Sequence, residues 1–238
     1  MSTARTSLAR LVGAIQLGPN VRSVHLGGSV LSGTDDEVSD LDLWVISDTW
    51  SPESLAGLLI AGQTVAIGDA PLFHGIDHQG VIVDIRYGPN VPDEYAPLGP
   101  MEAEPLPAGR IERESLITNF WIASYKHRKP LWRRLDAMAV LGLHFDRVAL
   151  LGAWVEHDTG GAPGPGAFSI HGLTPLVRDH VTPERRELLS LPTLSRKDLL
   201  NTIHEYRLEM LRMSPPDSQV ARIVTNDPLF ERMRADAL

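Results

Sequence analysis

The sequence has no cysteine among its 238 residues, which excludes disulfide bonds, thiolate nucleophiles and zinc sites built from cysteine. It also has few aromatic residues, at 6%, and fewer basic than acidic residues, 22 against 30. The resulting formal net charge of −8 gives no general affinity for nucleic acid or for an anionic membrane. We therefore expect neither as a partner.

Long hydrophobic runs are also missing from the sequence. Every apolar run is far shorter than the roughly 20 residues that span a bilayer. Residues 1–10 lack the apolar stretch behind a basic start that marks a signal peptide. We therefore expect a cytoplasmic protein. With 238 residues and 43% hydrophobic content, the chain can bury the core of one large domain or two small ones.

The first hundred residues alternate between apolar runs and turn signals. Apolar residues at helical spacing predict a helix over residues 4–17. Ser51 followed by Pro52 predicts a second helix, which would run to about Ala61. Short β-rich runs bounded by Gly, Asp or Pro predict the strands 21–26, 41–46, 64–67, 71–74 and 80–87. This half is therefore expected to hold a mixed sheet with helices.

The composition changes at about residue 88. Residues 88–109 hold six prolines and predict a linker or a wrapping loop. From residue 111 onward the pattern is helical, with a helix over 111–128 and a long one from Leu131 whose apolar face includes Met138 and Phe145. The expected fold class is α+β, with a mixed-sheet domain over residues 1–100 followed by an all-α helical domain over residues 101–238.

The stretch from Gly27 to Asp42 carries the clearest chemical signal. Asp40 and Asp42 would point to the same side of a strand, where two carboxylates repel each other unless a cation lies between them. Mg²⁺ takes carboxylate and phosphate oxygens. Upstream, Gly28 lets the backbone approach a phosphate and the Ser29 hydroxyl adds a donor. Taken alone, an Asp-x-Asp pair can also be a solvated turn.

The full spacing is more specific than either part. Gly28-Ser29 is followed by Gly33, then by Ser39-Asp40-Leu41-Asp42, and Asp84 lies in a later β-rich run. This pattern resembles the nucleotidyltransferase superfamily of the DNA polymerase β type, in its small antibiotic-modifying branch, over residues 20–87. The resemblance implies Asp40, Asp42 and Asp84 as catalytic residues and as ligands of two Mg²⁺ ions. It also implies that Gly28, Ser29 and Ser39 bind the nucleotide.

The helical half shows a looser resemblance. Aromatic residues at 120–121 and a basic segment at 129–134 look like the helical domain of aminoglycoside and lincosamide nucleotidyltransferases. Five positive charges fall between Lys126 and Arg134, where two helices are expected to meet. Because a triphosphate needs cationic neutralisation, we interpret Lys126 and Arg133 as candidate phosphate ligands. A solvated helix junction is the alternative.

The resemblance implies an activity. A nucleoside monophosphate, expected to be AMP from ATP, would pass to a hydroxyl of a small-molecule acceptor, and pyrophosphate would leave. The expected acceptor is an aminoglycoside- or lincosamide-like antibiotic, which the helical domain would recognise. The active site is expected between the two domains. Asp84 is either the base or a metal ligand, and Glu112 and Glu114 are further candidate bases.

Two other functions stay open at this point. The chain could transfer AMP to a protein, as antitoxin-type nucleotidyltransferases do, although those are usually single minimal domains. It could also be a catalytically inactive nucleotide-binding module, although all three carboxylates of the pattern are present. The identity of the NTP and of the acceptor hydroxyl, and whether the protein is a homodimer, are left open.

Overall fold

The computed structural model describes residues 3–67, 70–103, 105–113, 115–164, 167–168 and 170–237, and the chain divides into two compact units, Met1–Arg113 and Glu114–Leu238. A mixed sheet with helices is present, as the expected α+β fold class requires. The division between the units comes after Arg113, later than the expected boundary after residue 100. Each unit is described by itself below.

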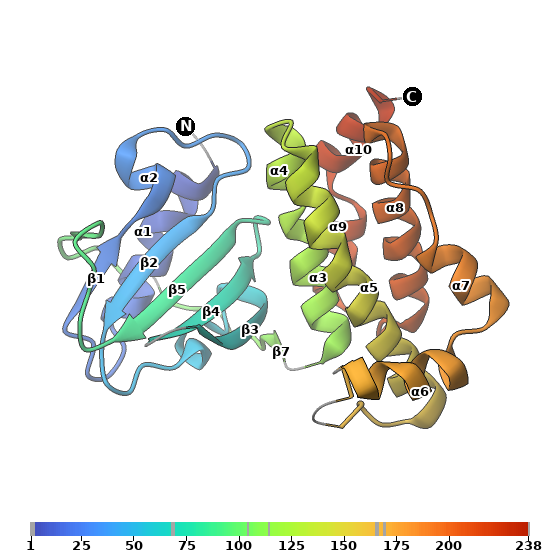
Figure 1. Ribbon diagram of the computed structural model, residues 1–238. Helices are drawn as coiled ribbons and strands as arrows, with labels where there is room; N and C mark the ends of the chain where they lie inside the picture. Colours follow the sequence, from blue (N-terminus) through green and yellow to red (C-terminus); the bar gives the residue numbers. More distant parts are fainter. Residues whose placement is uncertain are drawn as a thin grey trace. The chain divides into compact units, whose positions relative to one another are not determined.

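In the first unit, the described strands form one sheet in the order β6-β1-β2-β5-β4-β3-β7 (Figure 1). These strands are β1 (Ser23–Leu26), β2 (Leu41–Ile46), β3 (Leu59–Ile67), β4 (Ala70–Asp77), β5 (Ile82–Gly88), β6 (Ala96–Pro97) and β7 (Glu112–Arg113). Strands β2 and β5 run parallel, whereas β1 and β4 pair antiparallel with their neighbours at the centre. The sheet is therefore mixed, and the neighbouring strands β2 and β5 carry Asp42 and Asp84.

Helix α1 (Thr3–Gln16) covers one face of this sheet. Its Leu11 and Ile15 are fully buried and belong to one apolar core with Leu43 of β2 and Ile85 of β5. Side chains alternate along a strand, so the residues between these core positions point to the opposite face. On that face the central strands carry polar and aromatic side chains, namely Asp42, Trp44, His74, Asp84 and Arg86.

Two expectations about the first unit need correction. Ser51 does cap a helix, but that helix is the short 3-10 segment η1 (Pro52–Leu55), and strand β3 has begun by Leu59. The predicted helix to Ala61 is therefore wrong, because the apolar run after Gly57 pairs with β4 instead of continuing the helix. Part of the proline-rich segment also joins the sheet, since β6 pairs with β1.

In the second unit, the described secondary structure is helical. The helices are α3 (Leu116–Lys126), α4 (Arg128–Trp132), α5 (Asp136–Thr159), α6 (Ile170–His180), α7 (Pro183–Leu189), α8 (Arg196–Met213), α9 (Gln219–Thr225) and α10 (Pro228–Ala235). The predicted helix over 111–128 is shorter than expected, because residues 112–113 pair with β3 and the Ser115 hydroxyl caps the helix that follows. Pro130 lies inside α4.

A buried arginine on α8 joins this helix to three others of the unit. The Arg207 guanidinium on α8 donates to the hydroxyl and the carbonyl of Ser124 on α3, each at 2.9 Å, and to the Val224 carbonyl on α9 at 3.2 Å. It also lies over the Phe230 ring of α10, 4.0 Å from the ring centroid. Burial lowers the pKa of Arg207 to about 10, so the group keeps its charge at neutral pH. These contacts hold α3 against its neighbours, and the basic segment follows directly after α3.

Helix α5 does not bury the face that the sequence indicated. Leu135 just before it is 52% exposed, and Met138 and Phe145 are 59% and 69% exposed, whereas Leu143 and Leu150 are fully buried. Among the described helices, α5 alone is long and apolar enough by composition to cross a membrane, with a mean hydropathy of 1.4, and half of that window is buried inside the protein. Because apolar residues occur on both sides of α5, their spacing alone cannot identify the packed side.

Candidate active site

The sheet register brings two aspartates of the motif side by side. Asp42 on β2 is paired with Asp84 on the parallel neighbour β5. Adjacent strands lie about 5 Å apart, so the two carboxylates share one small area of the polar face. Asp40 is buried and comes directly before β2, two residues from Asp42. The structure thus assembles a carboxylate site from segments that are about forty residues apart in the chain.

The glycine turn packs directly against this site. The Gly27 N–H donates to the Asp42 carbonyl at 2.8 Å, which holds the turn to the start of β2. Gly28 has a φ of 64°, and a Cβ placed there would lie 2.0 Å from Asp42 Oδ2. Only glycine therefore allows the chain to pass so close to the Asp42 carboxylate. Ser29 follows in α2 (Gly28–Ser32), a single turn that ends at Gly33, where φ is 73°.

The loop between the glycine turn and the aspartates is tied down at both ends. Arg5 of α1 binds the Asp35 carboxylate through Nε at 2.9 Å and the Val30 carbonyl through Nη2 at 3.1 Å. The Ser39 hydroxyl donates to Asp36 Oδ1 at 2.8 Å and accepts from the Asp36 N–H at 2.9 Å. Ser39 is thus bonded within its own loop, and its expected contact with the nucleotide stays a prediction.

A histidine that the sequence analysis did not include contacts the site. His74 on β4 is paired with Asp84, and its Nδ1–H donates to Asp84 Oδ1 over 2.7 Å. The two side chains are only 15% and 18% exposed. This bond fixes the orientation of the Asp84 carboxylate, as partners behind a catalytic or metal-binding group commonly do. The pairing depends on the β4–β5 register, which has no local signal in the sequence.

The donor set suits magnesium. All three aspartates offer carboxylate oxygens, the ligands that Mg²⁺ prefers, and this ion usually takes one or two carboxylates together with substrate phosphates. Within the described residues, no group of three or more His, Asp or Glu side chains stands close enough to hold a metal by itself.

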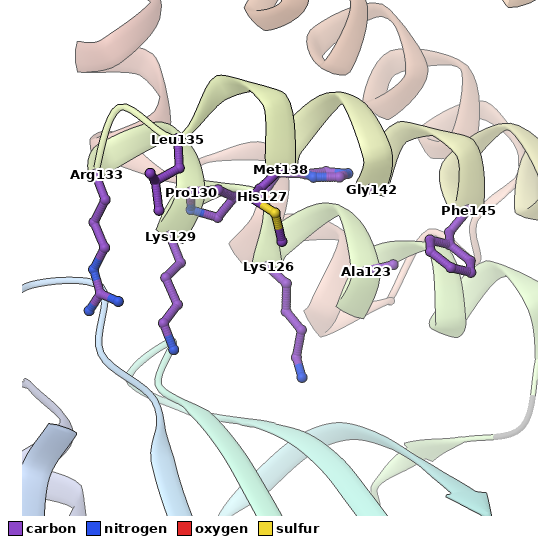
Figure 2. Close-up of a pocket in the computed structure, with 10 residues that line it drawn as sticks. All are labelled: Ala123, Lys126, His127, Lys129, Pro130, Arg133, Leu135, Met138, Gly142 and Phe145. Carbon is purple, nitrogen blue, oxygen red and sulfur yellow. The ribbon is translucent and has the colours of Figure 1, made fainter. Parts of the chain in front are cut away.

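The candidate phosphate ligands belong to a cavity in the second unit. This cavity of about 390 Å³ lies between the end of α3, α4 and the first turns of α5, and Lys126, Lys129 and Arg133 line it. Figure 2 shows these three side chains extending in the same direction. Pro130, Leu135, Met138 and Phe145 supply apolar lining. The structure thus groups Lys126 and Arg133 with Lys129, which the sequence analysis did not select, and phosphate binding by Lys126 and Arg133 stays a prediction.

A buried, hydrogen-bonded pair of side chains supports the wall of this cavity. His127 Nε2 and Asp146 Oδ2 are hydrogen-bonded at 2.8 Å, and both side chains are buried. The pair joins the end of α3 to the middle of α5. Gly142 makes room for it, because a Cβ at that position would lie 2.4 Å from His127 Cε1. The backbone that carries the basic residues on either side of His127 is therefore held in place.

The two further candidate bases find no support here. Glu112 lies in β7, which pairs with β3 at the end of the sheet order, whereas the three aspartates belong to its central part. Glu114 is outside the described residues. Asp84, which has a defined partner in His74, therefore remains the best-placed candidate base among those the sequence suggested.

No protein-family model and no curated protein matches this sequence. Among solved structures, the chain is similar to an aminoglycoside 6-adenyltransferase from Bacillus subtilis, with 12% identity, a TM-score of 0.32, and coverage of 98% of this chain and 99% of that one. It is also similar to a STING-associated CdnE c-di-GMP synthase from Capnocytophaga granulosa, with 12% identity, a TM-score of 0.27, and coverage of 98% and 80%. A third match is the Cid1 poly(U) polymerase, with 13% identity, a TM-score of 0.27, and coverage of 86% and 64%.

These matched proteins are nucleotidyltransferases, the superfamily that the sequence motif resembles. Their TM-scores lie well below 0.5, so the likeness carries no inference about the activity of this chain. A function for this protein is therefore inferred from its own residues, above all from the carboxylates and the glycine turn beside them.

Proposed function

We propose that the protein is a nucleotidyltransferase that moves a nucleoside monophosphate, most simply AMP from ATP, onto a hydroxyl of a small molecule. The observation that carries this proposal is the pairing of Asp42 with Asp84, with the Gly28 backbone packed against the Asp42 carboxylate. Carboxylates next to a tight glycine turn suit a magnesium-bound triphosphate.

The reaction is a displacement at the α-phosphorus. The acceptor hydroxyl oxygen forms the new bond to phosphorus, the bond to the β-phosphate oxygen breaks, and pyrophosphate leaves with that electron pair. Asp40 and Asp42 would hold Mg²⁺, which when bound would neutralise charge on the phosphates. Asp84 accepts the hydroxyl proton, because the hydrogen bond from His74 holds its carboxylate in a fixed orientation.

The cavity on the helical unit groups three cationic side chains. Lys126, Lys129 and Arg133 extend in one direction from a backbone braced by the pair of His127 and Asp146 (Figure 2). Phosphate oxygens form strong, charge-assisted hydrogen bonds with such groups. That these three cations bind phosphate is a proposal of its own, separate from the carboxylate site of the first unit.

The test combines product analysis with a matched pair of variants. The protein is incubated with MgCl₂, each of the four NTPs and a panel of aminoglycosides and lincosamides, while pyrophosphate release and the acceptor mass are followed. Asp42→Asn should lower the transfer rate by roughly a hundredfold or more, since several kcal/mol of charge stabilisation is lost. Asp48→Asn is the control, because Asp48 lies just beyond β2 and its side chain is 72% exposed.

Two results would count against the proposal. One is the absence of pyrophosphate release and of acceptor modification with every NTP and acceptor tested. The other is transfer by Asp42→Asn at the rate of Asp48→Asn, which would remove Asp42 from the reaction.

A further inference from the structure

The pairing of β6 with β1 brings a tyrosine to the glycine turn. Leu26, the last residue of β1, is paired with Ala96 in an antiparallel register. One residue farther along, Gly27 therefore lies opposite Tyr95. The backbone at Tyr95 is held in place, because its N–H donates to the Pro92 carbonyl at 3.1 Å. The sheet register thus places an aromatic side chain at the start of the turn that the proposed function assigns to phosphate.

The Tyr95 ring packs directly against Gly27. A Cβ placed on Gly27 would lie 2.6 Å from Tyr95 Cε1, and its three nearest atoms would all belong to this ring. The backbone of Gly27 has a φ of −124° and a ψ of −166°, an extended conformation that other residues also adopt. Gly27 is therefore required by the space that the ring takes, whereas Gly28 is required by its positive φ as well.

The same ring reaches across the end of β1 to β2. Tyr95 meets Trp44 of β2 edge to face, with ring centroids 5.5 Å apart. Because Gly27 has no side chain, the ring can lie over it and contact the strand beyond. An aromatic residue that covers a glycine on the neighbouring strand stabilises a β-sheet. Trp44 is only 8% exposed, so the ring packs against a side chain that is itself held in place.

Two neighbours therefore fix the glycine turn. Asp42 accepts from the Gly27 N–H through its carbonyl at 2.8 Å, and its carboxylate packs against Gly28. Tyr95 packs against Gly27, the residue that directly precedes α2 and its Ser29. The two neighbours are also close to each other, because the pKa of the Tyr95 phenol is raised first by burial and next by the negative charge of Asp42.

We propose that Tyr95 is a positioning residue for the nucleotide, which holds the glycine turn where its backbone N–H groups meet the triphosphate. Tyr95 acts through Gly27 instead of on the reacting atoms. The assignment rests on the proposed function, because it takes the glycine turn as the phosphate site. It differs from purely structural packing in one measurable respect: loss of the ring weakens nucleotide binding by protein that is still folded.

Titration with α,β-methylene-ATP and Mg²⁺ tests this role without any turnover. Tyr95→Ala should raise the dissociation constant, Kd, about tenfold, the factor expected when one charged hydrogen bond from the turn is lost. Tyr95→Phe keeps the ring and should keep the Kd of the wild type. Tyr87→Ala is the matched control, because Tyr87 also meets a tryptophan edge to face, with its ring centroid 5.2 Å from that of Trp50, but packs against the core.

Urea unfolding of each variant separates a change in binding from a change in stability. A purely structural role would lower the unfolding midpoint of Tyr95→Ala and leave the Kd of the folded protein unchanged. If Tyr95→Ala does not fold, Tyr95→Leu, which fills more of the space, takes its place.

A double-mutant cycle tests the contact itself. Gly27→Ala keeps an allowed backbone conformation but forces the ring or the turn to move, because real Cβ contacts stay at about 3.0 Å or more. It should raise Kd about tenfold in the wild-type background, again the loss of one charged hydrogen bond. In the Tyr95→Ala background, Gly27→Ala should have little further effect, since the ring is gone. Such non-additivity is typical of two residues that act through a direct contact.

Three outcomes would overturn the assignment. One is binding of the analogue by Tyr95→Ala as tightly as by Tyr87→Ala. Another is an effect of Gly27→Ala on Kd that is the same in both backgrounds. The third is a wild type that does not bind the analogue. If Kd changes as expected while no NTP and acceptor give pyrophosphate release, the proposed activity would be refuted and the positioning role of Tyr95 would remain.

Discussion

Gly28→Ala is the sharpest single perturbation of the carboxylate site. A Cβ at residue 28 would lie 2.0 Å from Asp42 Oδ2, whereas real Cβ contacts stay at about 3.0 Å or more. The Asp42 carboxylate would therefore have to move by about 1 Å, and a misplacement of that size can cost about a hundredfold in rate. We expect kcat for transfer to fall by roughly that factor.

The same substitution also strains the backbone, and a matched control separates the two effects. Gly33 ends the same turn with a φ of 73°, close to the 64° of Gly28, but a Cβ there would have nothing within 4 Å. A left-handed conformation costs a non-glycine residue about 1–2 kcal/mol. Gly33→Ala should thus lose about that much stability in urea unfolding and retain its turnover.

The assay is steady-state pyrophosphate release, with circular dichroism spectra to show that both variants fold. Gly28→Ala should be less stable than Gly33→Ala, because it adds the displacement of a carboxylate to the backbone strain. If Gly28→Ala turned over as fast as Gly33→Ala, the close approach of the turn to Asp42 would have no catalytic role, and the reasoning would fail.

Three other perturbations test other parts of the molecule. His74→Asn should lower kcat about tenfold or more with little change in KM for ATP, because Asp84 loses its orienting bond; a rise in KM alone would contradict this. Arg133→Ala should raise KM for ATP severalfold, and more so at low salt, whereas Arg134→Ala, an exposed neighbour, should not. The hydrogen bond from Arg185 holds the pKa of Asp158 well below its usual range, so Asp158→Asn should lower the melting temperature at pH 7. The difference in melting temperature between the wild type and the variant should begin to shrink below about pH 4, the ordinary pKa of the carboxyl. A difference that does not depend on pH would refute the stabilising role of the Asp158 charge.

Local signals predicted much of the fold because they act over a few residues. The bounds of β2 agree with the strand expected over residues 41–46, since an alternating apolar run between polar turns leaves little choice. The side chains of Thr182 and Ser195 each accept a backbone N–H in the first turn of the helix that follows, α7 and α8 respectively. Ser51 shows the limit of such signals, because a cap identifies where a helix begins and says nothing about its length.

The remaining features depend on contacts between distant residues. The burial of Asp146 in α5 follows from its bond to His127, and neighbouring apolar positions such as Phe145 are left exposed. The bond between His74 and Asp84 depends on the β4–β5 register. The edge-to-face contact of the Trp44 and Tyr95 rings depends on the chain after β5 folding back onto β2. Residue spacing does not predict any of these contacts. The sequence therefore predicts the carboxylates as candidate site residues but not the side chains that lie around them.

We expect the pairing of two carboxylates on neighbouring strands to oppose folding when no cation lies between them. Two negative charges about 5 Å apart repel each other by about 1–3 kcal/mol at the dielectric constants of a protein surface. Asp42 and Asp84 occupy such positions on the sheet, and structures keep such conflicts mainly where activity requires them. Without Mg²⁺, Asp42→Asn should therefore unfold at a higher urea concentration than the wild type, although it is expected to be inactive. Adding Mg²⁺ with α,β-methylene-ATP should stabilise the wild type more than the variant and narrow the difference. A variant that is less stable than the wild type in the absence of both would show that Asp42 serves the fold, and the case for its catalytic role would weaken.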